Sequence, residues 1–457
     1  MMNFPARRLQ AFKPATEKPY NVSYVVGMSA LLMVLIMLRA FDNRLVYLFM
    51  GVSGIVFLLS APRYCVTMLF FLLPFSSFLK PHPDSMSFFT VLFFLTVAKL
   101  VIANRKISVA LLMSAIAFFV YHLIFSGMRE LTTVITMIAG CLLLYYIRQE
   151  KIHIGAIVFA FAAGICLSSI LALLRDYLPL VNTFVREIML KMGEGEYQNR
   201  FSGFGGNPNY YTMSIVMAQA ALLVLMYQEK KQTIYMVMFS VLSVFGFTSV
   251  SQSFLVVWMM LVFFWFLISL QKGIGNLAKF VFVAILGLSL MSYFAFDYLV
   301  AFAYRLFEEN QGTLSSATTG RTDIWVEYLD AIFSDMRILF FGNGINTLLF
   351  KKGTHNTYLE SVFYFGLCGT TILCAMLRAG MQKIITAKIM WIPVLTLMVR
   401  MLAIGFITQD DLWFYLGLVV VLSGYCSKES INKNLEDRGQ VDVSDRLVAK
   451  TKRNKIL

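Results

Sequence analysis

The sequence contains little charge for its length. Only 14% of its 457 residues are Asp, Glu, Lys or Arg, whereas 59% are hydrophobic. Soluble domains carry roughly 25% charged residues, so this composition excludes an ordinary soluble protein. Continuous apolar runs of about 17–22 residues, long enough to cross ~30 Å of hydrocarbon as helices, recur along the chain. Because apolar and polar residues do not alternate within them, the runs also argue against a transmembrane β-barrel.

Residues that bind metals or form cross-links are scarce as well. The six cysteines lie within or at the ends of apolar runs and show neither a disulfide framework nor the spacing of a zinc site. The long polar loops contain no paired-aspartate metal motif, so we expect no metal and no other cofactor. There are four histidines, and only His355 lies in a long polar loop. For His82, His122 and His153 we expect structural roles.

The apolar runs predict an all-α polytopic integral membrane protein with about 12–14 transmembrane helices. The first run follows about twenty polar residues and lacks a small-residue cleavage site, so we expect an anchor and not a removed signal peptide. The expected spans are 22–41, 45–60, 64–79, 86–103, 107–126, 131–147, 154–174, 210–227, 233–250, 254–270, 277–296, 357–377, 385–406 and 412–426.

The connections divide the chain into seven segments. They are an N-terminal segment (1–21), a first bundle (22–174), a first long loop (175–209), further helices (210–296), a larger loop (297–356), C-terminal helices (357–426) and a basic tail (427–457). Within the loops, 186–192 and 323–341 mix charged and apolar residues at helical spacing, which predicts surface helices. The tail is polar enough that we expect it to be flexible.

Lysine and arginine predict the orientation. If the N-terminus is cytoplasmic, the short connections on the outer side hold only Arg44, Lys80 and Arg129, while most basic residues fall on the inner side. By the positive-inside rule both termini are then cytoplasmic and both long loops are extracytoplasmic. The net charge of +14 therefore reflects topology, and we expect no nucleic-acid partner.

Two polar stretches, 200–209 and 355–360, each run directly into an apolar segment. Asn207 followed by Pro208 predicts a helix start, with Asn as the cap and Pro at the first helical position. Thr357 and Glu360 have the spacing of a capping box, which starts a helix at Thr357. We therefore interpret Glu360 as a capping carboxylate in preference to a catalytic acid. Helix N-termini favour anions, phosphate in particular.

Arginines strengthen the expectation of a phosphate ligand, because the guanidinium fork matches phosphate oxygens. Arg200 opens the first stretch, and Arg321 lies in the larger loop. Arg400 lies inside an apolar span, where a charge usually faces a partner or a cavity. Its alternatives are an ion pair with Asp410 or Asp411, or contact with a lipid diphosphate. Arg305 and Arg337 fit either a solvated face or an additional phosphate contact.

The ordered motifs at 200–209, 320–325, 342–344, 355–360 and 365–367 resemble the O-antigen ligase and polymerase superfamily. The motifs cover the second half of the chain, and the topology covers all of it. The resemblance implies a GT-C-like fold and an inverting, metal-independent glycosyltransferase. The resemblance further implies that the substrate of this glycosyltransferase is an oligosaccharide linked to undecaprenyl diphosphate, at the outer face of the bacterial cytoplasmic membrane.

By this resemblance Arg200 and Arg321 hold the diphosphate, and His355 deprotonates or orients the acceptor hydroxyl. Considered alone, His355 is more simply an ordinary loop histidine. The candidate substrate-binding residues are Asn207, Asn209, Asn356, Tyr358, Arg305 and Arg400.

The expected function is polymerisation of lipid-linked repeat units into a surface polysaccharide, with membrane lipid, a chain-length regulator and a flippase as candidate partners. One alternative is an O-antigen ligase, which transfers the glycan to lipid A core or to protein. A second is a flippase or transporter for lipid-linked sugars, which predicts charges spread through a central cavity and internal repeats. The sequence shows neither of these last two features.

Overall fold

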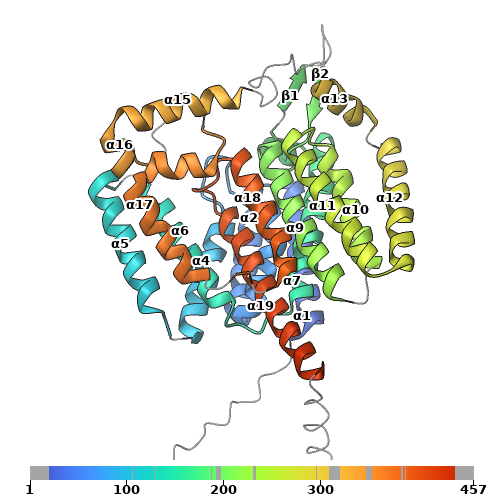
Figure 1. The fold of residues 1–457 in the computed structure, drawn as a ribbon, viewed down its shortest axis with the longest axis horizontal. Helices are drawn as coiled ribbons and strands as arrows, with labels where there is room; N and C mark the ends of the chain where they lie inside the picture. Colours follow the sequence, from blue (N-terminus) through green and yellow to red (C-terminus); the bar gives the residue numbers. More distant parts are fainter. Residues whose placement is uncertain are drawn as a thin grey trace, which may run out of the picture.

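The computed structural model describes residues 20–104, 106–128, 130–186, 188–191, 197–229, 233–294, 296–307, 320–345, 353–381, 384–385 and 387–437. These residues form a helical bundle with one small antiparallel sheet (Figure 1). Seven described helices are long and apolar enough to cross a membrane, and six shorter apolar helices accompany them. The prediction of an all-α polytopic membrane protein is thus confirmed at this level.

Each of the expected apolar runs contains a helix. The bundle helices are α1 (Val22–Phe41), α2 (Leu45–Leu59), α3 (Pro62–Leu72), α4 (Phe88–Asn104), α5 (Val109–Ser126), α6 (Leu131–Ile147), α7 (Ile154–Leu173), α9 (Pro208–Gln228), α10 (Thr233–Phe247), α11 (Gln252–Gln271), α12 (Ile274–Phe294), α17 (Thr357–Met381), α18 (Trp391–Ala403) and α19 (Asp411–Asp437). The helix α19 continues past residue 427, so the predicted tail is helical at its start.

The remaining elements are short or lie in the two long loops. They are η1 (Leu73–Phe75), η2 (Leu174–Asp176), α8 (Pro179–Phe184), β1 (Ile188–Lys191), β2 (Tyr197–Arg200), α13 (Phe296–Phe307), α15 (Arg321–Ser334), α16 (Met336–Phe341) and η3 (Lys388–Met390). The sheet, α13 and α15 lie at one end of the bundle, at the top of Figure 1. We call this the loop end.

The helix α9 forms the centre of the bundle. Nearly all of its residues are buried, and it packs against α7, α10, α11, α18 and α19. A helix that is apolar on every side can be buried in this way, whereas an amphipathic one cannot. Because its neighbours fix α9 on all sides, its first turn has a fixed position at the loop end.

The two predictions for surface helices had different outcomes. The helices α15 and α16 occupy 321–334 and 336–341, so the helical part of the prediction for 323–341 is confirmed. The prediction for 186–192 was wrong, because Ile188–Lys191 forms β1 and pairs antiparallel with β2, opposing Ile188 to Arg200. Within β1, Met189 is exposed and Leu190 is buried. This alternation suits a strand, and the segment is too short for helical periodicity to be decisive.

A sharp bend divides α17 into two parts that run in different directions (Figure 1). Gly366 has φ 63° and ψ −177° at the bend, a conformation that is essentially restricted to glycine. The backbone of Asn343 donates to the Phe363 carbonyl at 2.8 Å, so the segment after α16 packs directly on the bend. The predicted single span at 357–377 is therefore two helical segments.

Replacing Gly366 with alanine is expected to lower the melting temperature of the purified protein. A Cβ there would lie 2.4 Å from both the Phe340 carbonyl carbon and the Phe341 nitrogen, so the backbone would have to move. The strained φ/ψ alone costs about 1–3 kcal/mol. Gly51→Ala is the matched control, because nothing lies within 4 Å of its added Cβ in the middle of α2. A Gly366→Ala protein as stable as the control would contradict this account of the bend.

Candidate functional site

The loop end contains a fully buried arginine. Arg400 lies in the last turn of α18 with 0% of its surface exposed. Its guanidinium donates to Ser253 Oγ at 2.6 Å, to Thr212 Oγ1 at 2.9 Å and to the carbonyl oxygen of Asn209. All three partners are neutral. The predicted ion pair with Asp410 or Asp411 is wrong, since no carboxylate in the described part of the chain lies within ion-pair distance of Arg400.

The first turn of α9 supplies two of these contacts. Asn207 caps the helix, accepting from the Asn209 backbone N–H at 2.8 Å, and Pro208 occupies the first helical position, as predicted. The Asn209 side-chain oxygen accepts from Ser251 at 2.7 Å and from Ser253 at 3.4 Å. Because Ser251 caps α11, Asn209 joins the N-termini of α9 and α11 beside Arg400.

Arg200 ends β2 and is half-buried. Its Nε donates to the Ser249 carbonyl at 3.2 Å, and the next residue, Phe201, donates its backbone N–H to the Thr248 carbonyl at 3.0 Å. These contacts attach Arg200 to the connection between α10 and α11. Since that connection leads directly to Ser251, Arg200 and Asn209 are linked through a few residues of backbone.

Arg321 is the first residue of α15, and its positive charge acts on Arg400. The next turns of α15 lie against the second polar stretch. Trp325 Nε1 donates to the Thr354 carbonyl at 2.9 Å, and the buried Tyr328 ring packs on Phe363 with centroids 4.8 Å apart. Burial raises the pKa of Tyr328, and the nearby charge of Glu360 raises it further. The start of α15 thus lies near both α18 and the start of α17.

The second stretch places His355 just before α17, half-buried and with φ 50°. Histidine is among the residue types that tolerate this left-handed conformation. Asn356 is the cap, because its side-chain oxygen accepts from the backbone N–H groups of Tyr358 at 3.0 Å and Leu359 at 3.1 Å. The helix therefore starts at Thr357 as predicted, but its capping residue is Asn356.

The predicted capping box at Thr357 and Glu360 was wrong. The Thr357 hydroxyl donates to the Ile404 carbonyl, and the Glu360 carboxylate accepts from the Ile407 backbone N–H at 3.3 Å. Both side chains therefore form hydrogen bonds with the connection between α18 and α19 (residues 404–410). Spacing along the chain could not reveal this, since the partners lie more than forty residues away.

The other candidates form no hydrogen bond or ion pair with Arg400 in the described part of the structure. Tyr358 is exposed, and its hydroxyl donates to the Met398 carbonyl at 3.4 Å. Arg305 belongs to α13, but its side chain is outside the described part of the structure. His153 caps α7 by accepting from the Ala156 N–H at 3.2 Å, and His122 is buried in α5, so these two histidines have structural roles as predicted.

Several residues at this site were not predicted from the sequence. Ser251 and Ser253 contact Asn209, and Ser253 with Thr212 contacts Arg400. The polar run at 249–253, set between two apolar helices, was the available signal. In the described residues no group of three or more His, Cys, Asp or Glu side chains could hold a metal ion.

Comparison with protein-family models finds no match, and comparisons with curated proteins and with solved structures find none either. Arg200, Arg321 and Arg400, which we call the arginine site, are linked by the contacts above at the loop end. The loop that carries His355 adjoins them through α15. A buried cation with neutral partners and a second cation nearby is an environment that favours a bound anion.

Proposed function

We propose that this protein is a glycosyltransferase that polymerises lipid-linked oligosaccharide repeat units, with the loop end on the extracytoplasmic side of the bacterial cytoplasmic membrane. The donor is the growing chain on undecaprenyl diphosphate, and the acceptor is the next lipid-linked repeat. The observation that carries the proposal is Arg400, a fully buried cation whose partners are a carbonyl and two hydroxyls. Isolated buried charge is costly, and a bound diphosphate would offset that cost.

The placement of the arginine site supports a ligand that is part lipid and part sugar. Arg400 lies at the end of a bundle helix, and Arg321 is the first residue of a loop helix and lies close enough for its charge to act on Arg400. A diphosphate at this level would have its polyprenyl chain beside the apolar helices and its glycan among the polar loops. A soluble anion would gain nothing from the apolar helices.

In the proposed reaction the acceptor hydroxyl oxygen attacks the anomeric carbon of the donor sugar from the face opposite the diphosphate. A new C–O bond forms and the bond between carbon and diphosphate oxygen breaks, with its electron pair leaving on the diphosphate. His355 takes the hydroxyl proton, which a histidine can do near neutral pH. Arg321 and Arg200 stabilise the negative charge that develops on the leaving diphosphate.

The experiment that tests this function is turnover by the purified full chain in detergent, supplied with a lipid-linked repeat unit and no energy source. We expect glycans of two or more repeats, together with one free undecaprenyl diphosphate for each bond formed, measured by mass spectrometry. If the repeats are not joined to one another but are transferred singly to added lipid A core, with release of undecaprenyl diphosphate, the ligase reaction replaces this proposal. If no glycosidic bond forms with either acceptor, the protein is not a glycosyltransferase of this kind.

A further inference from the structure

A second polar feature, a cavity of about 330 Å³, lies at the loop end. Its walls come from the connection between η1 and α4 (residues 76–87), the first turn of α9, and the connection between α18 and α19. Its uncharged polar lining includes Ser76, Ser85, Ser87, Thr90, Thr408 and Gln409. Lys80, Asp410, Asp411 and Tyr210 also line it. We call it the Asp410 cavity, and its volume is within the range of ~300–1,000 Å³ usual for small-molecule sites.

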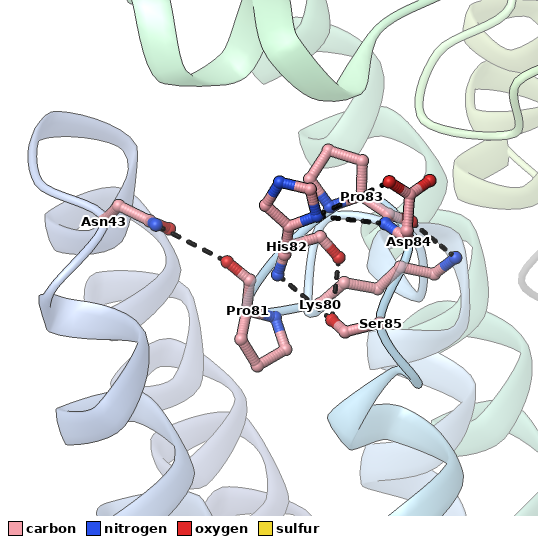
Figure 2. Close-up of polar contacts among 7 residues, drawn as sticks. All are labelled: Asn43, Lys80, Pro81, His82, Pro83, Asp84 and Ser85. Atoms are coloured by element: carbon pink, nitrogen blue, oxygen red, sulfur yellow. Dashed lines mark hydrogen bonds and ion pairs between the residues drawn. The ribbon is translucent and has the colours of Figure 1, made fainter.

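The 76–87 wall is held in a fixed shape (Figure 2). The Lys80 ammonium donates to the Pro83 carbonyl at 3.2 Å, and the Ser85 hydroxyl donates to the His82 carbonyl at 2.7 Å. The buried Arg39 of α1 donates to the Lys80 carbonyl and lies 4.4 Å from the centre of the Phe78 ring. A loop with this many internal contacts presents its side chains in a defined arrangement, as a binding site requires.

The 404–410 wall connects the cavity to the arginine site. The Phe406 and Ile407 backbone N–H groups donate to Thr357 Oγ1 and to the Glu360 carboxylate, at the start of α17. The Tyr210 hydroxyl donates to the Gly405 carbonyl. Tyr210 directly follows Asn209, whose carbonyl accepts from Arg400. A contact of the arginine site and a residue that lines the cavity are therefore neighbours in the first turn of α9.

The chemistry of the cavity is opposite to that of the arginine site. It has two carboxylates and one ammonium among hydroxyls and amides. Thr90 donates to Asp410 Oδ2 at 2.8 Å, so this carboxylate is oriented. Burial raises the pKa of Asp410, while the Thr90 hydrogen bond and the charge of Lys80 lower it. Carboxylate and hydroxyl oxygens are strong acceptors for sugar hydroxyls, and the carboxylates would repel an acidic group.

We infer that the Asp410 cavity is a glycan subsite that binds a neutral or amino-substituted sugar ring of the lipid-linked repeat, beside the diphosphate held at the arginine site. This inference rests on the proposed function and names the part of the substrate that the arginines do not hold. Thr90 donates to Oδ2 of Asp410. The other carboxylate oxygen, Oδ1, accepts hydrogen bonds from sugar hydroxyls. The subsite excludes acidic sugars at this position of the repeat.

The test uses the repeat-unit oligosaccharide released by mild acid from the lipid-linked glycan of the cells that make this protein. Binding to the purified full chain is measured as a rise in melting temperature, and turnover is measured with the intact lipid-linked repeat. Asp410→Asn keeps an acceptor for Thr90 but removes the charge, and Thr90→Val removes the orienting hydrogen bond. Asp84→Asn is the matched control, because Asp84 lies on the same wall with 93% of its side chain exposed.

The free oligosaccharide is expected to stabilise the wild type, Arg321→Ala and Asp84→Asn proteins, but to stabilise Asp410→Asn and Thr90→Val much less. In turnover, Asp410→Asn is expected to raise KM about tenfold with kcat within about twofold, the pattern of lost ground-state binding. Equal stabilisation of all variants, or none of the wild type, overturns the subsite. Stabilisation that depends on Asp410 without any turnover keeps the subsite and overturns the proposed function.

Discussion

Replacing His355 with alanine is expected to lower the rate of glycan transfer by about 10²- to 10⁴-fold, the range usual for loss of a general base. The side chain lies outside the regular helix, and the cap of α17 and the hydrogen bond to Ile404 are made by Asn356 and Thr357 and not by His355. The measurement is initial rate with a lipid-linked repeat, alongside the yield of membrane-inserted protein. Added imidazole is expected to restore part of the activity.

The matched control is His153→Asn, which replaces another histidine and keeps an acceptor for the Ala156 N–H at the start of α7. Its rate should equal that of the wild type. Polymer of normal length and rate from His355→Ala would remove the base from the proposed mechanism. Equal loss in both variants would assign the effect to folding.

Replacing Arg321 with alanine is expected to lower kcat by about 10²- to 10³-fold, as removal of one preorganised charge stabiliser does in other enzymes. The reason is that Arg321 stands at the start of α15, where its charge adds to that of the buried Arg400. Arg321→Lys is expected to recover only part of the rate, because an ammonium cannot make the two parallel bonds of a guanidinium. Rates are measured on purified protein of verified monodispersity.

Arg337→Ala is the control for Arg321, because Arg337 lies exposed on the neighbouring helix α16 of the same loop. It should leave kcat unchanged. If Arg321→Ala and Arg337→Ala had the same small effect, the loop arginines would be solvated charges, and the anion site would have to depend on Arg400 and Arg200 alone.

The bundle could be predicted from the sequence because the apolar runs are mostly continuous and polar residues separate each run from the next. The start of α9 was equally predictable, since Asn207 and Pro208 act on their own helix. The bend of α17 could not be predicted, because Gly366 takes its conformation from packing against residues 340–342. The strand β1 was missed for a similar reason, since its partner β2 lies further along the chain.

The sequence indicated which residues are candidates for the site but not which contacts they make. The positions of Arg200, Arg321 and His355 in polar loops suggested a common location. The polar run at 249–253 marks a connection between two helices, but it does not show that Ser251 and Ser253 contact Asn209 and Arg400. An ion pair of Arg400 with Asp410 or Asp411 was one of two alternatives for Arg400, and Asp410 instead accepts from Thr90 of α4, 320 residues away. A contact between residues so far apart in the chain depends on how the helices pack, which the sequence pattern does not give.

The proposed mechanism requires that the lipid diphosphate binds at the arginine site. A cryo-electron microscopy structure of the full chain with undecaprenyl diphosphate tests this directly. We predict density for the two phosphates among Arg200, Arg321 and Arg400 at the loop end, with the lipid chain along the bundle helices. Diphosphate density at the opposite end of the bundle, or at the loop end but away from these three arginines, would contradict it.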